Sequence, residues 1–161
     1  MAGKTGSGPH DAAALTDAFE NRVEELLEKP FMIIDMLPVQ VPENSRGQYF
    51  AVEEYYRRSG RIVRIKERYI DLLLAINAYE DLWVMAESVG QPVKNPSPDS
   101  LAEWVKSEKH LSILADGGKT LLTMDADDTY ATVYQPGKAF LKLLNKLAGA
   151  NGLFVWQPPK E

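Results

Sequence analysis

The residues best suited to chemistry in this chain are three neighbouring aspartates, Asp125, Asp127 and Asp128. Carboxylate oxygens are the preferred ligands of hard divalent cations, and calcium-binding loops begin with aspartates at alternate positions. Such a loop requires a glycine where this sequence has Tyr130 and a bidentate glutamate where it has Pro136. Two interpretations therefore stay open, a weak divalent-cation site or an acidic turn whose side chains bond nearby backbone amides.

The apolar residues 121–124, followed by Asp125-Ala126-Asp127-Asp128-Thr129, resemble the first motif of the haloacid-dehalogenase-like phosphotransferases, a hydrophobic strand and then D-x-D-x-T. The resemblance implies a magnesium-dependent phosphotransferase or phosphatase. Asp125 would attack phosphorus, Asp127 would act as general acid, and both would help to hold the metal ion. In that family the motif lies near the start of a parallel-sheet domain, and later motifs supply a lysine and further acidic ligands. Here the 32 residues after Thr129 contain one acidic residue, Glu161.

A second concentration of charge lies between Arg57 and Arg68, where six of the 18 basic residues fall within twelve positions. On a helix that begins near Arg61, the side chains of Arg61, Arg64 and Arg68 share one face beside an apolar stripe. Such a face could bind an anion, RNA or an acidic protein, and nearby tyrosines could stack on bases. The simpler interpretation is a solvated helix face, neutralised by the acidic residues Glu53, Glu54, Glu67 and Asp71.

The alternation of residues 129–134 predicts a strand with Tyr130, Thr132 and Tyr134 on one face and apolar residues on the other. The apolar face must point to the core. The tyrosine and threonine face is either a binding surface with rigid aromatic side chains or a surface that a helix covers.

Composition excludes several classes of chemistry. The chain has no cysteine, which rules out disulfides, thiolate metal sites and cysteine nucleophiles. Its two histidines lie far apart in the sequence, and no G-x-S-x-G nucleophile elbow occurs. A net charge of −5 repels phosphate backbones on average, and no apolar run is long enough to cross a bilayer. We therefore expect no cofactor and no membrane contact, with nucleic acid as the less favoured partner.

The elements that must position these residues follow an α+β pattern. Hydrophobic periodicity predicts helices over residues 11–28, 48–58, 61–79, 98–109 and 136–149. Short apolar or alternating runs predict strands over residues 31–36, 81–87, 111–115, 120–124, 129–134 and 153–156. Residues 81–87 could instead continue the preceding helix. Turn-forming sequences separate the later strands. This arrangement predicts a mainly antiparallel sheet, made from a late β-meander and a C-terminal strand and packed with about five helices.

The sequence is interpreted as a single α+β domain over residues 11–157, with a disordered leader at 1–10 and a disordered tail at 158–161. The proline-rich segment 91–98 is predicted to be a surface connection that could divide the domain into two halves.

These patterns together favour a non-enzymatic cytoplasmic accessory or protein-interaction domain of bacterial type. We expect its partner to be a protein, either a different one or a second copy in a homodimer. Two alternatives stay open: the magnesium-dependent phosphotransferase at Asp125 and Asp127, and nucleic-acid or anion binding through the segment Arg57–Arg68.

Overall fold

The computed structural model describes residues 9–159 and contains, within that range, five α-helices and one seven-stranded antiparallel sheet. The helices are α1 (Pro9–Leu27), α2 (Arg46–Arg58), α3 (Ile62–Tyr79), α4 (Pro98–Ser107) and α5 (Lys138–Ala150). The strands are β1 (Phe31–Asp35), β2 (Trp83–Ala86), β3 (Val93–Lys94), β4 (His110–Ala115), β5 (Thr120–Asp125), β6 (Ala131–Tyr134) and β7 (Phe154–Trp156). Short 3₁₀ turns occupy Glu43–Ser45 and Asp116–Gly118. The predicted α+β class, with its late meander and C-terminal strand, is confirmed.

The sheet has the strand order β3-β2-β4-β5-β6-β1-β7. Its centre is the meander β4-β5-β6, in which each strand pairs with the next through a short connection. The first strand in the sequence, β1, joins the outer side of β6, and the last strand, β7, pairs with β1. The sheet therefore brings residues near 35, 130 and 155 together, although they are far apart in the sequence.

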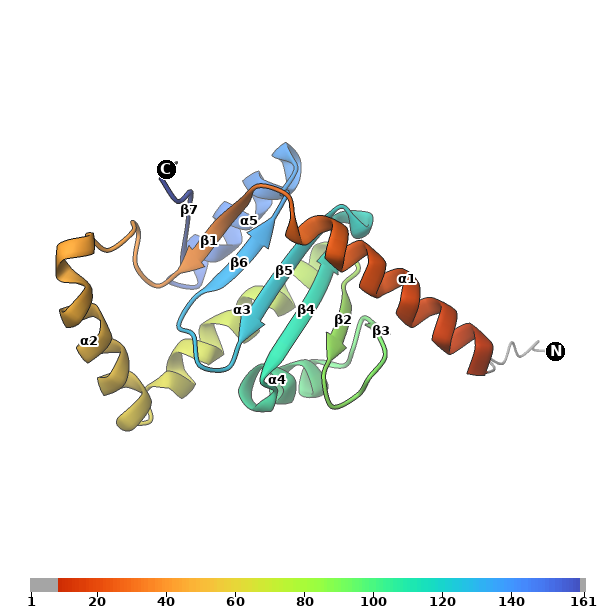
Figure 1. The fold of residues 1–161 in the computed structure, drawn as a ribbon, viewed down its shortest axis with the longest axis horizontal. Coiled ribbons are helices and arrows are strands. Elements are labelled where there is room, and N and C mark those ends of the chain that lie inside the picture. The colour runs from red at the N-terminus through yellow and green to blue at the C-terminus, as the bar shows by residue number, and fades with distance from the viewer. Residues whose placement is uncertain (1–8, 160–161) are drawn as a thin grey trace.

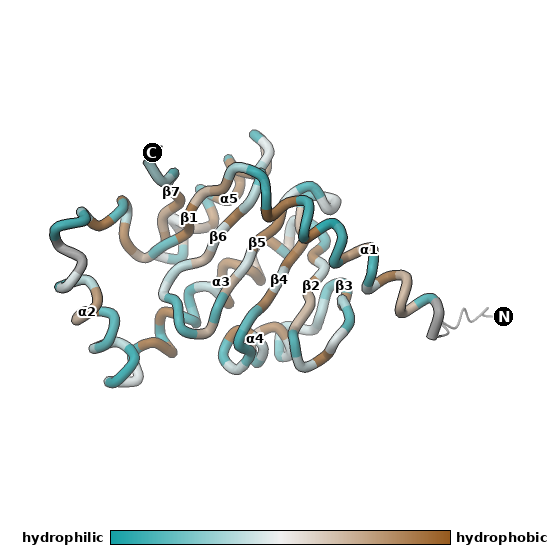
Figure 2. The backbone as a smooth tube through the Cα atoms, viewed as in Figure 1, coloured by the Kyte–Doolittle hydropathy of each residue, from teal (hydrophilic) through white to brown (hydrophobic). Residues whose placement is uncertain are grey.

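Helices α3, α4 and α5 cover one face of the sheet, and the main core lies between them and the strands (Figure 1). The apolar stripe of α3 is fully buried at Leu72, Leu73 and Ile76, as its helical spacing predicts. These side chains belong to the same cluster as the inward residues of the strands, Leu122 and Val133 among them. Figure 2 shows that hydrophobic stretches are prominent along the central strands.

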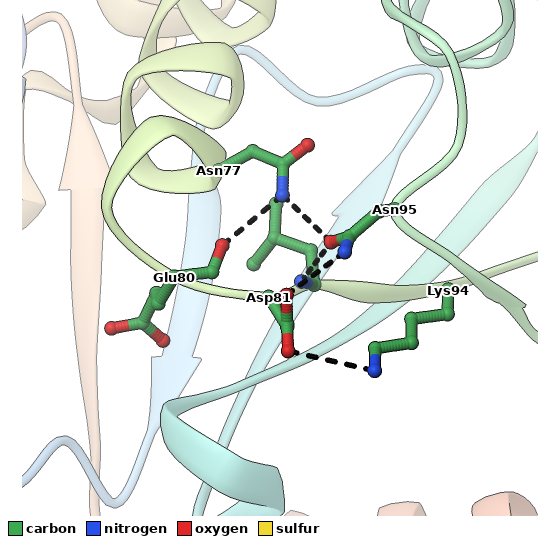
Figure 3. Close-up of polar contacts among 6 residues, drawn as sticks. Asn77, Glu80, Asp81, Lys94 and Asn95 are labelled. Carbon is green, nitrogen blue, oxygen red and sulfur yellow. Dashed lines mark hydrogen bonds and ion pairs between the residues drawn. The ribbon is translucent and has the colours of Figure 1, made fainter.

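The proline-rich connection before α4 is held by Asn95, whose positive φ of 48° suits asparagine better than most residues. Figure 3 shows its amide between the end of α3 and the start of β2. Asn95 Oδ1 accepts hydrogen bonds from Asn77 Nδ2 at 2.8 Å and from the amide of Leu82 at 2.9 Å. Asn95 Nδ2 donates to Asp81 Oδ1, whose other oxygen lies 3.6 Å from Lys94 Nζ. The connection is therefore fixed on the sheet edge, where its residues Val93 and Lys94 form β3.

Several boundaries differ from the sequence-based expectation. The short strand β3 lies inside segment 91–98, and strands from both sides of that segment share one sheet. The last helix, predicted to end at residue 149, continues to Ala150, and the positive φ that follows it falls at Gly152, where φ is 72°. Helix α1 begins at Pro9, while residues 1–8 of the expected leader and residues 160–161 of the expected tail lie outside the described range. Among the described residues, no helix combines the length and apolarity that a membrane span needs.

Candidate functional site

The second face of the sheet is only partly covered. Helix α1 packs on it through Phe19 and Leu26, which form a small cluster with Leu114 and Leu121. Strand register places these two leucines in one row across the sheet, together with Trp83, Tyr134 and Phe31. This row is apolar and aromatic because α1 lies on it, and Figure 1 shows the helix crossing the sheet there.

The next row across the same face consists of smaller and more polar side chains. Its central members are Ser112, Thr123, Thr132 and Ile33, which are direct neighbours in register on β4, β5, β6 and β1. No helix crosses this part of the face in Figure 1, and Ser112, Thr132 and Ile33 are only half-buried, whereas Thr123 between them is 8% exposed. We call these four residues the open strip. The row ends at Trp156 of β7, the register partner of Ile33.

A hollow of about 400 Å³ lies at the β1 end of the open strip. Ile33 and Trp156 form one side of it, and α2 forms the other side through Tyr49, Phe50 and Glu53. Asp35, Asp128 and Tyr130 also line it, so its chemical character is acidic and aromatic. We call this hollow the acidic pocket. Its lining combines residues from β1, α2, β7 and the turn before β6.

Two side chains of α2 hold that helix against the turn. Arg57 donates a hydrogen bond of 2.6 Å to the carbonyl of Asp127, and it forms an ion pair of 3.2 Å with Glu53 Oε1. The hydroxyl of Tyr49 donates to the other oxygen of Glu53 at 3.2 Å and lies 3.5 Å from the hydroxyl of Thr129. Glu53 is consequently buried, with 8% of its surface exposed, and both its oxygens have partners. These contacts fix the wall of the acidic pocket.

Asp35 differs from Glu53 because part of its carboxylate has no partner. Only 6% of Asp35 is exposed, and its Oδ1 is the one buried side-chain polar atom in the described range without a hydrogen bond. Burial raises the pKa of Asp35, and the charge of Glu53 adds to this effect. The backbone amides of Leu37 and Met36 act in the opposite direction. A buried carboxylate oxygen with no donor is costly, and such groups in native proteins call for an explanation.

Asp128, on the turn, shows a related perturbation. Burial raises the pKa of Asp128, and the negative charges of Asp125 and Glu53 raise it further. Burial also raises the pKa of the neighbouring Tyr130, and the charge of Asp128 contributes. Clustered titratable groups with perturbed pKa values are typical of functional sites.

The structure brings only two of the three aspartates singled out in the sequence together, because Asp125 and Asp128 line one small hollow that Asp127 does not line. Asp125 Oδ1 lies 2.7 Å from His110 Nδ1 at the exposed end of β5, and Asp127 is exposed on the turn. Asp128 faces the acidic pocket, and its backbone amide bonds to the carbonyl of Asp125 at 3.1 Å. Among the side chains that the structure describes, no group of three or more from histidine, aspartate or glutamate is arranged to hold a metal ion. The antiparallel sheet also differs from the parallel sheet that the phosphotransferase resemblance implies.

The predicted grouping of Arg61, Arg64 and Arg68 does occur. These side chains line a separate hollow of about 310 Å³ between α2 and α3. The guanidinium of Arg61 lies 5.7 Å from the ring centre of Tyr55, and Arg68 donates to the carbonyl of Gly152 at 3.2 Å. All three arginines are exposed, and anion or nucleic-acid binding by them stays a prediction.

The predicted face of Tyr130, Thr132 and Tyr134 is divided between three surroundings. Thr132 lies in the open strip, Tyr134 is beside α1 and 5.6 Å from the ring of Phe31, and Tyr130 lines the acidic pocket. Tyr134 thus matches the interpretation of a helix-covered face, while binding by Tyr130 and Thr132 stays a prediction.

Sequence reasoning did not identify Asp35, Glu53 or Trp156 as site residues. Asp35 did give a signal, because it is the single charged residue in the apolar run 31–36. Glu53 and Trp156 come from elements whose proximity only the tertiary fold determines. No protein-family model, curated protein or solved structure matches this chain, so its function must be argued from this geometry.

Proposed function

We propose that this protein is a non-enzymatic interaction domain that binds a partner protein along the open strip of its sheet. The observation that carries the proposal is the contrast between neighbouring rows of one sheet face. The apolar row has a helix of this chain on it, whereas the row that contains Ser112, Thr123 and Thr132 has none. A rigid sheet surface of this kind needs no conformational change to receive a partner.

The composition of the strip and its margins supports this proposal. Ser112 and Thr132 supply hydroxyl groups that can donate or accept hydrogen bonds, and Ile33 supplies apolar area. Exposed aromatic residues lie near the β1 end, where Phe31 is 42% and Phe154 is 44% exposed. Aromatic side chains at the margin of a mixed polar and apolar surface are typical of protein interfaces. The absence of cysteine from the sequence suits a reducing compartment such as the cytoplasm.

The geometry gives less support to an enzyme. Asp125, the nucleophile in the phosphotransferase hypothesis, is bonded to His110, and its neighbour Asp127 is exposed on the turn rather than directed to a shared centre. A catalytic nucleophile and acid must both reach one reacting atom. We therefore favour binding over catalysis.

Capture from the source organism's lysate tests the proposal. Immobilised wild-type protein is compared with Thr132→Arg, which places a long cation in the open strip. The matched control is Ala150→Arg, at the exposed end of α5 on the helical side of the sheet. Bound protein and nucleic acid are both identified after washes at low and at high salt.

We expect a protein that resists high salt and binds the wild type and Ala150→Arg but not Thr132→Arg. Ser112→Lys, on a different strand of the strip, should have the same effect, and thermal melting checks that every variant is folded. Equal capture by both strip variants, or capture of only salt-labile nucleic acid, would contradict the proposal.

A further inference from the structure

We infer that the acidic pocket receives a cationic side chain, arginine or lysine, from the protein bound along the open strip. This inference rests on the proposed function, because the strip and the pocket are continuous. Ile33 belongs to the strip and also lines the pocket, and its register partner Trp156 lines the pocket beside it. A segment lying on the strip would therefore reach the pocket with its next outward side chain.

The first argument is the unpartnered oxygen of Asp35. The residue is almost fully buried and lines the pocket, and its Oδ1 has no hydrogen-bond donor among the groups that the structure describes. Leaving such an atom unsatisfied opposes folding, and a hydrogen-bond donor that reaches the carboxylate from the pocket would offset part of the penalty. A charged donor gives the larger gain, because hydrogen bonds between ions are shorter and stronger than neutral ones.

The second argument is the uncompensated charge. Asp35, Glu53 and Asp128 all line the pocket, while no described lining residue is lysine or arginine. Glu53 is paired with Arg57 at 3.2 Å, but the ion pairs among the described side chains, those of residues 11–44 and 47–159, include neither Asp35 nor Asp128. Besides burial, the charge of Glu53 raises the pKa of both aspartates, and Arg57 opposes this charge effect only at Asp128. A cation in the pocket would therefore stabilise the charged form of both carboxylates.

The third argument is the aromatic wall, which distinguishes an organic cation from a metal ion. Tyr49, Phe50, Tyr130 and Trp156 surround the carboxylates, and aromatic faces attract guanidinium and ammonium groups. A metal ion would instead need several oxygen ligands at close range, and the described carboxylates form no such group. A hollow of about 400 Å³ has ample room for the end of one side chain.

Binding of a minimal probe tests the inference. The probe is Nα-acetylarginine amide, and its control is Nα-acetylcitrulline amide, which has nearly the same shape but no charge. Titration of the full chain is followed through the indole N–H resonance of Trp156, and Nα-acetyllysine amide serves as a second cationic probe. We expect the arginine probe to shift this resonance and to bind about tenfold more tightly than citrulline, or better.

Asp35→Asn should weaken binding of the arginine probe by about tenfold, because it removes the buried charge and keeps the shape. Asp127→Asn is the matched control, at a residue beside Asp128 on the turn before β6 but outside the pocket lining, and it should leave the affinity unchanged. Glu53→Gln and Asp128→Asn supply the same test if Asp35→Asn does not fold. Equal affinity for arginine and citrulline, or an arginine affinity that none of the pocket variants alters, would overturn the inference.

The two proposals can fail separately. Loss of partner capture in Thr132→Arg without probe binding would leave the strip as the interface and reject the cationic pocket. The opposite result is that the probe binds in a charge-dependent way while both strip variants capture the partner as the wild type does. This result would support the cation specificity of the pocket. It would reject the strip as the interface, and with it the inference that the cation comes from a protein bound on the strip.

Discussion

Replacing Asp35 by asparagine should stabilise the protein at neutral pH. The wild-type carboxylate is 6% exposed, and its Oδ1 has no hydrogen-bond partner in the described structure. Asparagine has the same shape and retains a carbonyl oxygen that can accept hydrogen bonds from the nearby backbone amides. The substitution therefore removes a desolvated charge at little cost in packing, which is the expected behaviour of a group retained for binding rather than for stability.

The magnitude follows from the cost of the unpartnered group. A buried polar group without a partner destabilises a protein by about 1–3 kcal/mol, and by more when it is charged. The amide nitrogen of asparagine would itself lack an acceptor, so only part of this cost is recovered, about 1–2 kcal/mol in the free energy of unfolding. For a chain of 161 residues each kcal/mol corresponds to about 2–4 °C, which gives a rise in Tm of about 2–8 °C.

The pH dependence identifies the cause. Burial raises the pKa of Asp35 above its ordinary value of 3.8, so the folded state binds the proton more tightly than the unfolded state. The destabilisation is complete above the raised pKa, decreases as the pH falls through it, and is absent below 3.8. Glu53 and Asp128 face the same pocket and titrate in both proteins, so the relevant quantity is the difference between wild type and variant.

Denaturant or thermal unfolding of both proteins between pH 7 and pH 4 measures this difference. The stability gain of Asp35→Asn should be largest at pH 7 and should shrink as the pH falls. A variant that is less stable than the wild type at pH 7, or a gain that does not change with pH, would refute the reasoning.

Three further substitutions test how the site is positioned. Tyr69→Phe removes a buried hydroxyl that lies 3.0 Å from the carbonyl of Ile34 and 2.9 Å from that of Thr129. It should lower the free energy of unfolding, measured in urea, by about 1–2 kcal/mol. The control Tyr79→Phe, at a residue 69% exposed, should leave this free energy unchanged. Leu26→Ala should lower the free energy of unfolding by about 2–5 kcal/mol, because it opens a cavity between α1 and the sheet. The same change at Leu27, which is 45% exposed, should lower it much less, and equal effects would contradict the packing of α1. Asn95→Ala should lower the free energy of unfolding by about 1–2 kcal/mol, because it removes the acceptor of two hydrogen bonds at a residue with positive φ, and an unchanged Tm would contradict that role.

The fold could largely be predicted from the sequence where local pattern determines structure. The apolar stripe that contains Leu72 and Ile76 specifies α3, and Ser97 before Pro98 specifies the start of α4, where the Ser97 hydroxyl accepts from the amide of Ser100 at 3.1 Å. Strand order could not be predicted, because nothing in residues 31–36 indicates that β1 inserts between β6 and β7.

The candidate site was less predictable than the fold. Sequence spacing identified Asp128 and Tyr130 within a short motif, but their neighbours in the acidic pocket are Asp35, Glu53 and Trp156. These residues lie on four separate parts of the chain. The pairing of β1 with β6 and β7, and the contacts of α2 with residues 127 and 129, bring them together. Motif spacing alone therefore suggested metal chemistry, whereas the assembled geometry favours recognition of a cation.

The most direct test of the open strip as a partner-binding surface is photo-crosslinking in the living source organism. A benzophenone amino acid replaces Thr132 in one strain and Ala150 in a second, and the crosslinked peptides are sequenced by mass spectrometry. The account predicts an adduct from position 132 and none from position 150, with an arginine or lysine close to the crosslinked residue of the partner, whether that partner is a different protein or a second copy. Adducts from position 150 alone, or a position 132 that reacts only with water and small molecules, would contradict it.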